Sequence, residues 1–228
     1  MKKFELTNES IEVNGVKLYR IKSLINFRDV KAGDLGGYVE KEDNLSHNGE
    51  AWVYDDAHVS DNAQVYGNAQ VSGNARVYGN AKVFGDAAVF GYTCVYGNAQ
   101  VYGDATVFGY VQVSSNAQVY GNTRVYDNAW VSGNALVSGN TWVNGYARVS
   151  GNAILLSDGD YICFKGFGYE NRNTTMFKEK DSLIFVNCGC FSGTLSEFES
   201  RVKETHGNNK FAKEYLALVE AAKIHFEV

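Results

Sequence analysis

Few residues in this chain have the types and spacing that catalysis or metal binding requires. His58 is the only histidine in the repetitive centre of the sequence, and so the only candidate general base there. Cys188 and Cys190 could bind a metal through thiolates, but no second cysteine pair follows and only His206 is nearby. We therefore predict no catalytic residue, no metal site and no cofactor. We expect His58 on the surface and the two cysteines as half-buried thiols at a strand end.

Aromatic and basic residues are stronger candidates for binding. Tyr92, Tyr110 and Tyr146 occupy turn positions where asparagine or aspartate is the rule, and a turn needs no tyrosine there. Tyrosine rings can stack on a flat ligand, while arginine pairs with phosphate or carboxylate. The residues predicted to line such a site, between subunits, are Tyr92, Tyr110, Tyr146, Phe90, Phe108, Arg76, Arg124 and Arg148.

A six-residue repeat must position these side chains. Every sixth residue from Val53 to Val149 is valine, followed four residues later by a small residue, usually alanine. Alternation along a strand turns the valine and the small residue inward and the neighbours of valine outward. The Gly-Asn or Gly-Asp between them tolerates the backbone conformation of a sharp corner. Three such sides make a triangular coil of about eighteen residues, as in solenoid repeats.

Residues eighteen apart are expected to stack in columns on each side of this prism. Two of the sides carry aromatic columns, which is more exposed apolar surface than a monomer ordinarily tolerates. We therefore predict an oligomer. The residues expected at its interface are Tyr66, Phe84, Tyr102, Tyr120 and Lys82. Whether the aromatic columns are wholly interface or also line a ligand cleft is left open by the sequence.

The segments flanking the repeat lack its six-residue sequence pattern. Residues 1–50 are predicted to form a small β cap, with a hairpin turn at Asn14-Gly15. Residues 51–156 are the repeat. Residues 157–228 are predicted to form two or three strands and two helices, the first beginning at a capping box of Thr194 and Glu197 and the second spanning about 209–225. Terminal coils expose unpaired edges, so the flanking segments are expected to act as caps.

Composition excludes several classes of function. The 228 residues carry a net charge of −5 with no basic arm, which argues against a nucleic-acid-binding surface. No stretch approaches the length of a membrane span, and the first residues lack an apolar signal segment. The four cysteines lack the density of a disulfide scaffold. We expect a cytoplasmic protein with reduced thiols.

The repeat, as in the segment 71–76 (Val-Ser-Gly-Asn-Ala-Arg), resembles the hexapeptide-repeat superfamily. That resemblance implies a left-handed coil and a homotrimer with parallel axes. Together with the segments 34–40 and 190–195, the chain is similar to proteins common in phages and prophages. The predicted fold is mainly β: a three-sided left-handed parallel β-helix of about six coils, with a small N-terminal β cap and a C-terminal α+β module.

Many hexapeptide-repeat proteins are acyltransferases that use a histidine base and a loop projecting from the coil. Here the repeat has no interruption for such a loop. We predict a non-enzymatic homotrimeric binding protein of phage or prophage type. Its expected partner is a small anionic or nucleotide-like ligand or a host protein, and its expected role is to antagonise host defence in the host cytoplasm. An acyltransferase-like enzyme with substrate between subunits, or a structural spacer, are the alternatives.

Overall fold

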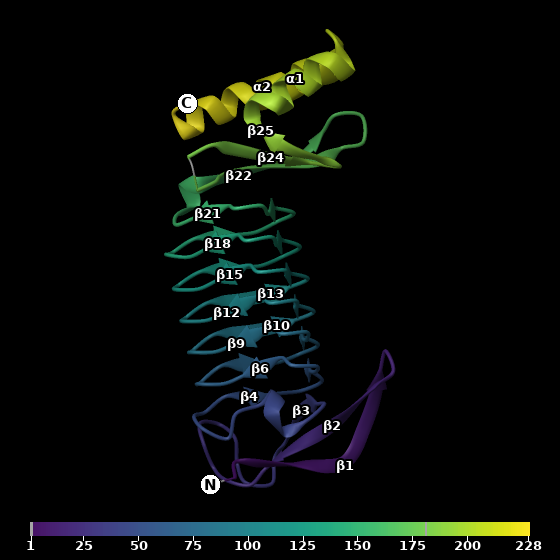
Figure 1. Ribbon diagram of the computed structural model, residues 1–228, viewed down its shortest axis with the longest axis vertical. Coiled ribbons are helices and arrows are strands. Elements are labelled where there is room, and N and C mark those ends of the chain that lie inside the picture. The colour runs from purple at the N-terminus through teal and green to yellow at the C-terminus, as the bar shows by residue number, and fades with distance from the viewer. Residues whose placement is uncertain (1, 181) are drawn as a thin grey trace.

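The computed structural model describes residues 2–180 and 182–228. It is a tall three-sided prism with a strand hairpin at the N-terminal end and two helices at the C-terminal end (Figure 1). Three parallel sheets form the sides of the prism, and the valines and alanines of the repeat fill its interior with no exposed surface. The predicted fold class, a parallel β-solenoid with small flanking modules, is confirmed.

Each turn of the solenoid contributes one short strand to each of three faces. Face 1 consists of β3 (Leu35–Val39), β5 (His58–Val59), β8 (Arg76–Val77), β11 (Cys94–Val95), β14 (Gln112–Val113), β17 (Trp130–Val131) and β20 (Arg148–Val149). Face 2 consists of β4 (Trp52–Val53), β7 (Gln70–Val71), β10 (Ala88–Gly91), β13 (Thr106–Gly109), β16 (Arg124–Val125) and β19 (Trp142–Val143). Face 3 consists of β6 (Gln64–Val65), β9 (Lys82–Val83), β12 (Gln100–Val101), β15 (Gln118–Val119), β18 (Leu136–Val137) and β21 (Ile154–Leu155).

Strand register places residues eighteen apart directly above one another. Val101, for example, lies opposite Val83 below and Val119 above. The same spacing joins side chains at one corner, where asparagine amides form a ladder; Asn116 accepts from the amide of Asn98 and donates to Asn134, at 3.0 Å each. The column arrangement inferred from the repeat is therefore correct.

The solenoid has about seven turns, one more than the six predicted for residues 51–156. The additional turn comes from the segment assigned to the N-terminal cap. Tyr38 and Val39 of β3 pair in parallel with β5, and Leu45, just after the short helix η1 (Glu42–Asn44), bridges to Val65. The backbone passes so close that a Cβ on Gly36 would lie 2.6 Å from the carbonyl oxygen of Val53. Only glycine fits there, and no valine of the six-residue pattern marks this turn.

A two-stranded arm precedes this first turn. It consists of β1 (Phe4–Val13) and β2 (Val16–Ser23), and β2 extends face 1 by pairing antiparallel with β3. The turn between the strands has positive φ at both Asn14 and Gly15, 52° and 82°, as the sequence predicted for a tight hairpin. We call β1 and β2 together the arm.

The C-terminal module closes the other end of the prism. Four antiparallel strands form its sheet: β22 (Tyr161–Phe167), β23 (Arg172–Lys178), β24 (Ile184–Cys188) and β25 (Phe191–Thr194). The helices α1 (Leu195–His206) and α2 (Lys210–Phe226) cover the outer side of this sheet (Figure 1). The predicted capping box is present, with Thr194 accepting from the Glu197 N–H and Glu197 from the Thr194 N–H.

Side chains that alternate along the strands of this sheet pack into two different hydrophobic cores. Phe177 of β23 joins the solenoid core, whereas its neighbour Met176 joins a separate core with the helices. Polar side chains of the sheet also bond the last turn, because Asn187 donates to the Arg148 carbonyl and Thr175 accepts from the Arg148 N–H, both at 2.9 Å. The module thus covers an edge that would otherwise be unpaired.

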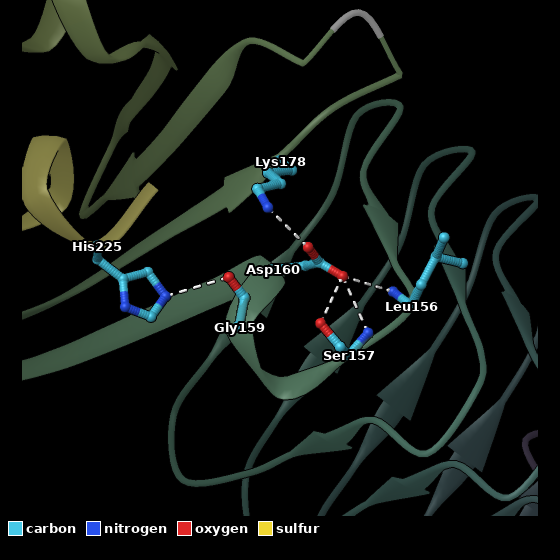
Figure 2. A network of polar contacts seen from close by, with 6 residues as sticks. All are labelled: Leu156, Ser157, Gly159, Asp160, Lys178 and His225. Atoms are coloured by element: carbon cyan, nitrogen blue, oxygen red, sulfur yellow. Dashed lines mark hydrogen bonds and ion pairs between the residues drawn. The ribbon is translucent and has the colours of Figure 1, made fainter. Parts of the chain in front are cut away.

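A polar network fastens the module to the last turn (Figure 2). Asp160, in the short helix η2 (Asp158–Asp160), accepts from the backbone N–H groups of residues 156–157 and from Lys178 Nζ at 2.9–3.0 Å. His225 of α2 lies 3.1 Å from the Gly159 carbonyl oxygen. The Asp160 carboxylate therefore joins residues 156–157 to β23, and His225 joins α2 to the backbone of the same short helix.

Candidate functional site

Two strands of face 2 are longer than the others and carry an aromatic column. β10 and β13 have four residues each, so that Phe90 pairs directly with Phe108. The two rings stack at 5.0 Å, and Phe108 stacks on Tyr126 at 5.2 Å. Neighbouring strands of the solenoid are separated by nearly the same distance as these stacked rings, so the rings can stack without bending the solenoid.

The corner after this column carries a second stack. Tyr92 and Tyr110 lie with ring centroids 5.0 Å apart and planes 2° from parallel, and their exposed fractions are 56% and 62%. We call Phe90, Phe108, Tyr92 and Tyr110 the aromatic edge. Tyr146, the third corner tyrosine, lies two turns above Tyr110 with Asn128 between them, so it is not part of this stack.

The basic residues predicted beside these tyrosines lie in three different places. The Arg124 guanidinium lies on face 2, 5.0 Å from the Trp142 ring centroid. Arg148 lies on face 1 over Trp130, at 5.6 Å. Arg76 lies four turns below Arg148, near the arm. The structure therefore brings Phe90, Phe108, Tyr92 and Tyr110 together, with Arg124 on the same face, and separates the other three predicted ligand residues from them.

Face 3 carries the column predicted at the trimer interface. Tyr66, Phe84, Tyr102 and Tyr120 stack in one continuous row with centroids 4.8 Å apart and are all half-buried within a single chain. Burial raises the pKa of the Tyr66 and Tyr102 hydroxyls. Lys82 is the only charged side chain among the outward strand residues of this face. A flat, aromatic and nearly uncharged side has the composition of an interface core.

The arm encloses a cleft against face 1, which we call the arm cleft. Its volume is about 320 Å³, at the lower end of the range for small-ligand sites. The residues lining it are mostly apolar on the arm and mostly polar on the first turns of face 1. They are Val13, Asn14, Val16, Leu18, His58, Ser60, Asp61, Arg76, Val77, Tyr78 and Cys94.

The prediction that His58 lies on the surface is wrong, because the arm makes it a half-buried residue of this cleft. Its Nδ1 atom is buried, with no hydrogen-bond partner among the residues that the structure describes. Burial, and then the charge of Arg76, hold the pKa of His58 below its usual range. Burial raises the pKa of the Cys94 thiol. At neutral pH the cleft therefore presents an uncharged imidazole and an uncharged thiol beside the side chains of Arg76 and Asp61.

The arm cleft was missed by the sequence reasoning. Asn14-Gly15 located the hairpin turn, and alternating Val16 and Leu18 give β2 an apolar side. These signals do not say which part of the solenoid that side faces, because the direction of the arm depends on the pairing of β2 with β3.

Clusters of side chains that could hold a metal ion, and helices that could cross a bilayer, are both absent from residues 2–180 and 182–228, the part of the chain that the structure describes. Three or more histidine, cysteine or acidic side chains do not come together there in a way that could hold a metal ion. The four cysteines are free thiols; Cys188 is buried and Cys190 is exposed, so neither is half-buried as predicted. Neither described helix is long and apolar enough to cross a bilayer.

Comparison with known families gives one match. The family model described as YdcK beta solenoid repeat matches the chain at residues 69–83, 99–115, 117–133 and 129–145. These segments include Phe108, Tyr110, Tyr102 and Tyr120, but not Phe90, Tyr92, Tyr66 or Phe84. The chain matches no curated protein. Fold and family match together identify the chain as a β-solenoid repeat protein.

Proposed function

We propose that this protein is a non-enzymatic homotrimer that binds a flat anionic ligand, nucleotide-like in chemistry, at the aromatic edge. The observation that carries the proposal is the exposed stack of Tyr92 on Tyr110. The repeat places asparagine at the same corner in other turns, at Asn74 and Asn128, so the fold itself does not require these rings.

The geometry of the stack supports recognition of a planar ring. The two tyrosine rings are held parallel by the strand spacing, so they lose little freedom when a ligand binds. Stacking of a base on an aromatic side chain contributes roughly 1–3 kcal/mol. Arg124, on face 2 in the strand that pairs with β13, supplies a cation for a phosphate or carboxylate group. Together these groups favour a nucleotide-like anion over an uncharged ligand.

The non-enzymatic assignment is supported by the state of His58 and Cys94. A catalytic histidine is ordinarily oriented by a hydrogen bond from its second ring nitrogen, and a nucleophilic cysteine has a lowered pKa. His58 Nδ1 has no partner within the described residues, and the Cys94 pKa is shifted upward. These features favour binding over acyl transfer.

The homotrimer is proposed to form through face 3. This face is lined by the continuous ring stack from Tyr66 to Tyr120 and carries one charge, at Lys82. Face 1 is partly covered by the arm, which leaves face 3 open for a second chain. The resemblance to phage and prophage proteins favours a role in host cytoplasm, where the ligand would be a defence signal that the protein sequesters.

Two measurements test the proposal. Native mass spectrometry of the full chain should give three times the chain mass of 25.1 kDa, and a monomer would contradict the homotrimer. Calorimetric titration with AMP should show binding that the double variant Tyr92→Asn, Tyr110→Asn weakens about tenfold or more, at about 1.4 kcal/mol for each factor of ten. Asparagine is the residue that the repeat itself uses at this corner.

The matched control for this titration is Tyr96→Ser. Tyr96 stacks on Tyr78 with the same 5.0 Å and 2° geometry on face 1, where serine is the usual residue in other turns. AMP binding should be unchanged in this control. Equal binding by the wild type and the double variant would disprove the aromatic edge as the ligand site.

A further inference from the structure

We propose a second ligand site, in the C-terminal module, that takes a small aromatic carboxylate. It is a cavity of about 320 Å³ between β24, β25 and the two helices, which we call the module cavity. It lies at the opposite end of the molecule from the arm cleft and uses no residue of the aromatic edge. This inference therefore stands apart from the proposed function of the solenoid.

Part of the lining of the module cavity is aromatic and apolar. Phe191 and Phe198 lie with centroids 5.2 Å apart, and Phe198 meets Tyr215 edge to face at 5.7 Å. Aromatic walls of this kind pack well against a planar ring. The lining residues of low polarity are Cys188, Phe191, Phe198, Val202 and Tyr215.

The remaining lining residues are mostly hydrogen-bond donors or cations. Arg172 comes from β23, and Arg201 and His206 come from α1. In the part of the chain that the structure describes, no acidic side chain lines the cavity. An apolar cavity with two arginines at its wall and no carboxylate is matched to an anion.

Arg172 is positioned in advance. Glu170 accepts from its Nε and Nη2 atoms at 3.0 and 2.6 Å, which leaves the third guanidinium nitrogen, Nη1, without a protein partner among the described residues. Gly189 makes room for it, because a Cβ there would lie 2.6 Å from Nη1. The fixed guanidinium can thus donate to a ligand without first giving up a bond.

Charge and size define the class of ligand. Glu170 balances part of the Arg172 charge, and Arg201 has only a surface pairing with Glu204 at 3.4 Å. Within the described residues, the lining itself therefore presents two guanidinium groups and no carboxylate to a bound group, as suits a single carboxylate. The cavity volume lies at the lower end of the range for ligand pockets and suits one aromatic ring with a short acidic chain.

The test is calorimetric titration of the full chain with 3-phenylpropionate and with the neutral isostere 3-phenylpropan-1-ol. We expect the acid to bind at least tenfold more tightly than the alcohol. Arg201→Gln should weaken binding of the acid about tenfold. Because the Arg201 side chain is 64% exposed, we expect this variant to fold like the wild type. Arg172→Gln should weaken binding of the acid by at least the same factor.

Lys203→Gln is the matched control. It removes one positive charge from the same helix at a 58% exposed position that does not line the cavity. Its affinity for the acid should equal that of the wild type, and thermal melting of all variants establishes that they are folded. Three results would overturn the proposal: no binding of the acid, equal affinity for acid and alcohol, or equal losses in Arg201→Gln and Lys203→Gln.

Discussion

Replacing Gly73 with alanine should destabilise the protein more than the same change at Gly145. The two glycines occupy the same corner of the solenoid, have φ of 66° and 65°, and each donates its N–H to an aspartate one turn below, Asp55 or Asp127. They differ only in what lies above. A Cβ on Gly73 would be 3.1 Å from the Gly91 nitrogen, whereas a Cβ on Gly145 would have no atom of the described residues within 4 Å.

The magnitudes follow from this difference. Alanine at positive φ costs about 1–2 kcal/mol at either site. At Gly73 the added methyl group also presses on the next turn, which adds about 1–3 kcal/mol, the usual cost of overpacking. Gly73→Asp should be about 1 kcal/mol more stable than Gly73→Ala. The introduced carboxylate can accept a hydrogen bond from the Gly91 N–H, just as Asp55 accepts one from the Gly73 N–H at 2.9 Å.

The assay is equilibrium urea unfolding of the full chain at one protein concentration, since self-association would stabilise the folded state by mass action. The expected order of stability is Gly145→Ala above Gly73→Asp, with Gly73→Ala the least stable. Equal losses for the two alanine variants, within about 0.5 kcal/mol, would refute the inter-turn contact. A Gly73→Asp variant as unstable as Gly73→Ala would refute the proposed role of the corner aspartates.

Two further outcomes can be measured by urea unfolding. Asn116→Ala should lose about 1–2 kcal/mol, because it removes the middle of the amide ladder and both of its 3.0 Å hydrogen bonds, whereas Asn74→Ala, at a corner without such a ladder bond, should change little. Burial alone would raise the pKa of Asp160, but the N–H groups of residues 156–157 and Lys178 hold that pKa below its usual range. The stabilisation from Asp160 is therefore fully present above the unfolded pKa of about 3.9 and is lost as the pH falls through the lower folded value. Wild type should exceed Asp160→Asn in stability at pH 7 and approach it below about pH 4; a constant difference across that range would contradict the role of the carboxylate.

Several features of this protein could be predicted from sequence because they depend on local periodicity. The valine at every sixth position determined the solenoid, its inward side chains and the eighteen-residue column spacing, since strand alternation and corner glycines act within a few residues. The same spacing predicted that Tyr92 stacks on Tyr110 and that Phe90 stacks on Phe108. The Asn14-Gly15 turn and the Thr194 capping box were equally local signals.

Only the tertiary structure decided where separate segments meet. The first turn at β3 and Leu45 follows no six-residue pattern, because strand pairing and the close approach at Gly36 form it. The spread of Arg76, Arg124 and Arg148 over two faces depends on which side of each coil a residue occupies. The arm cleft and the module cavity are built by segments far apart in sequence, His58 with Leu18 and Arg172 with Arg201. Sequence periodicity determines what repeats, whereas packing between non-repeating segments determines the cavities.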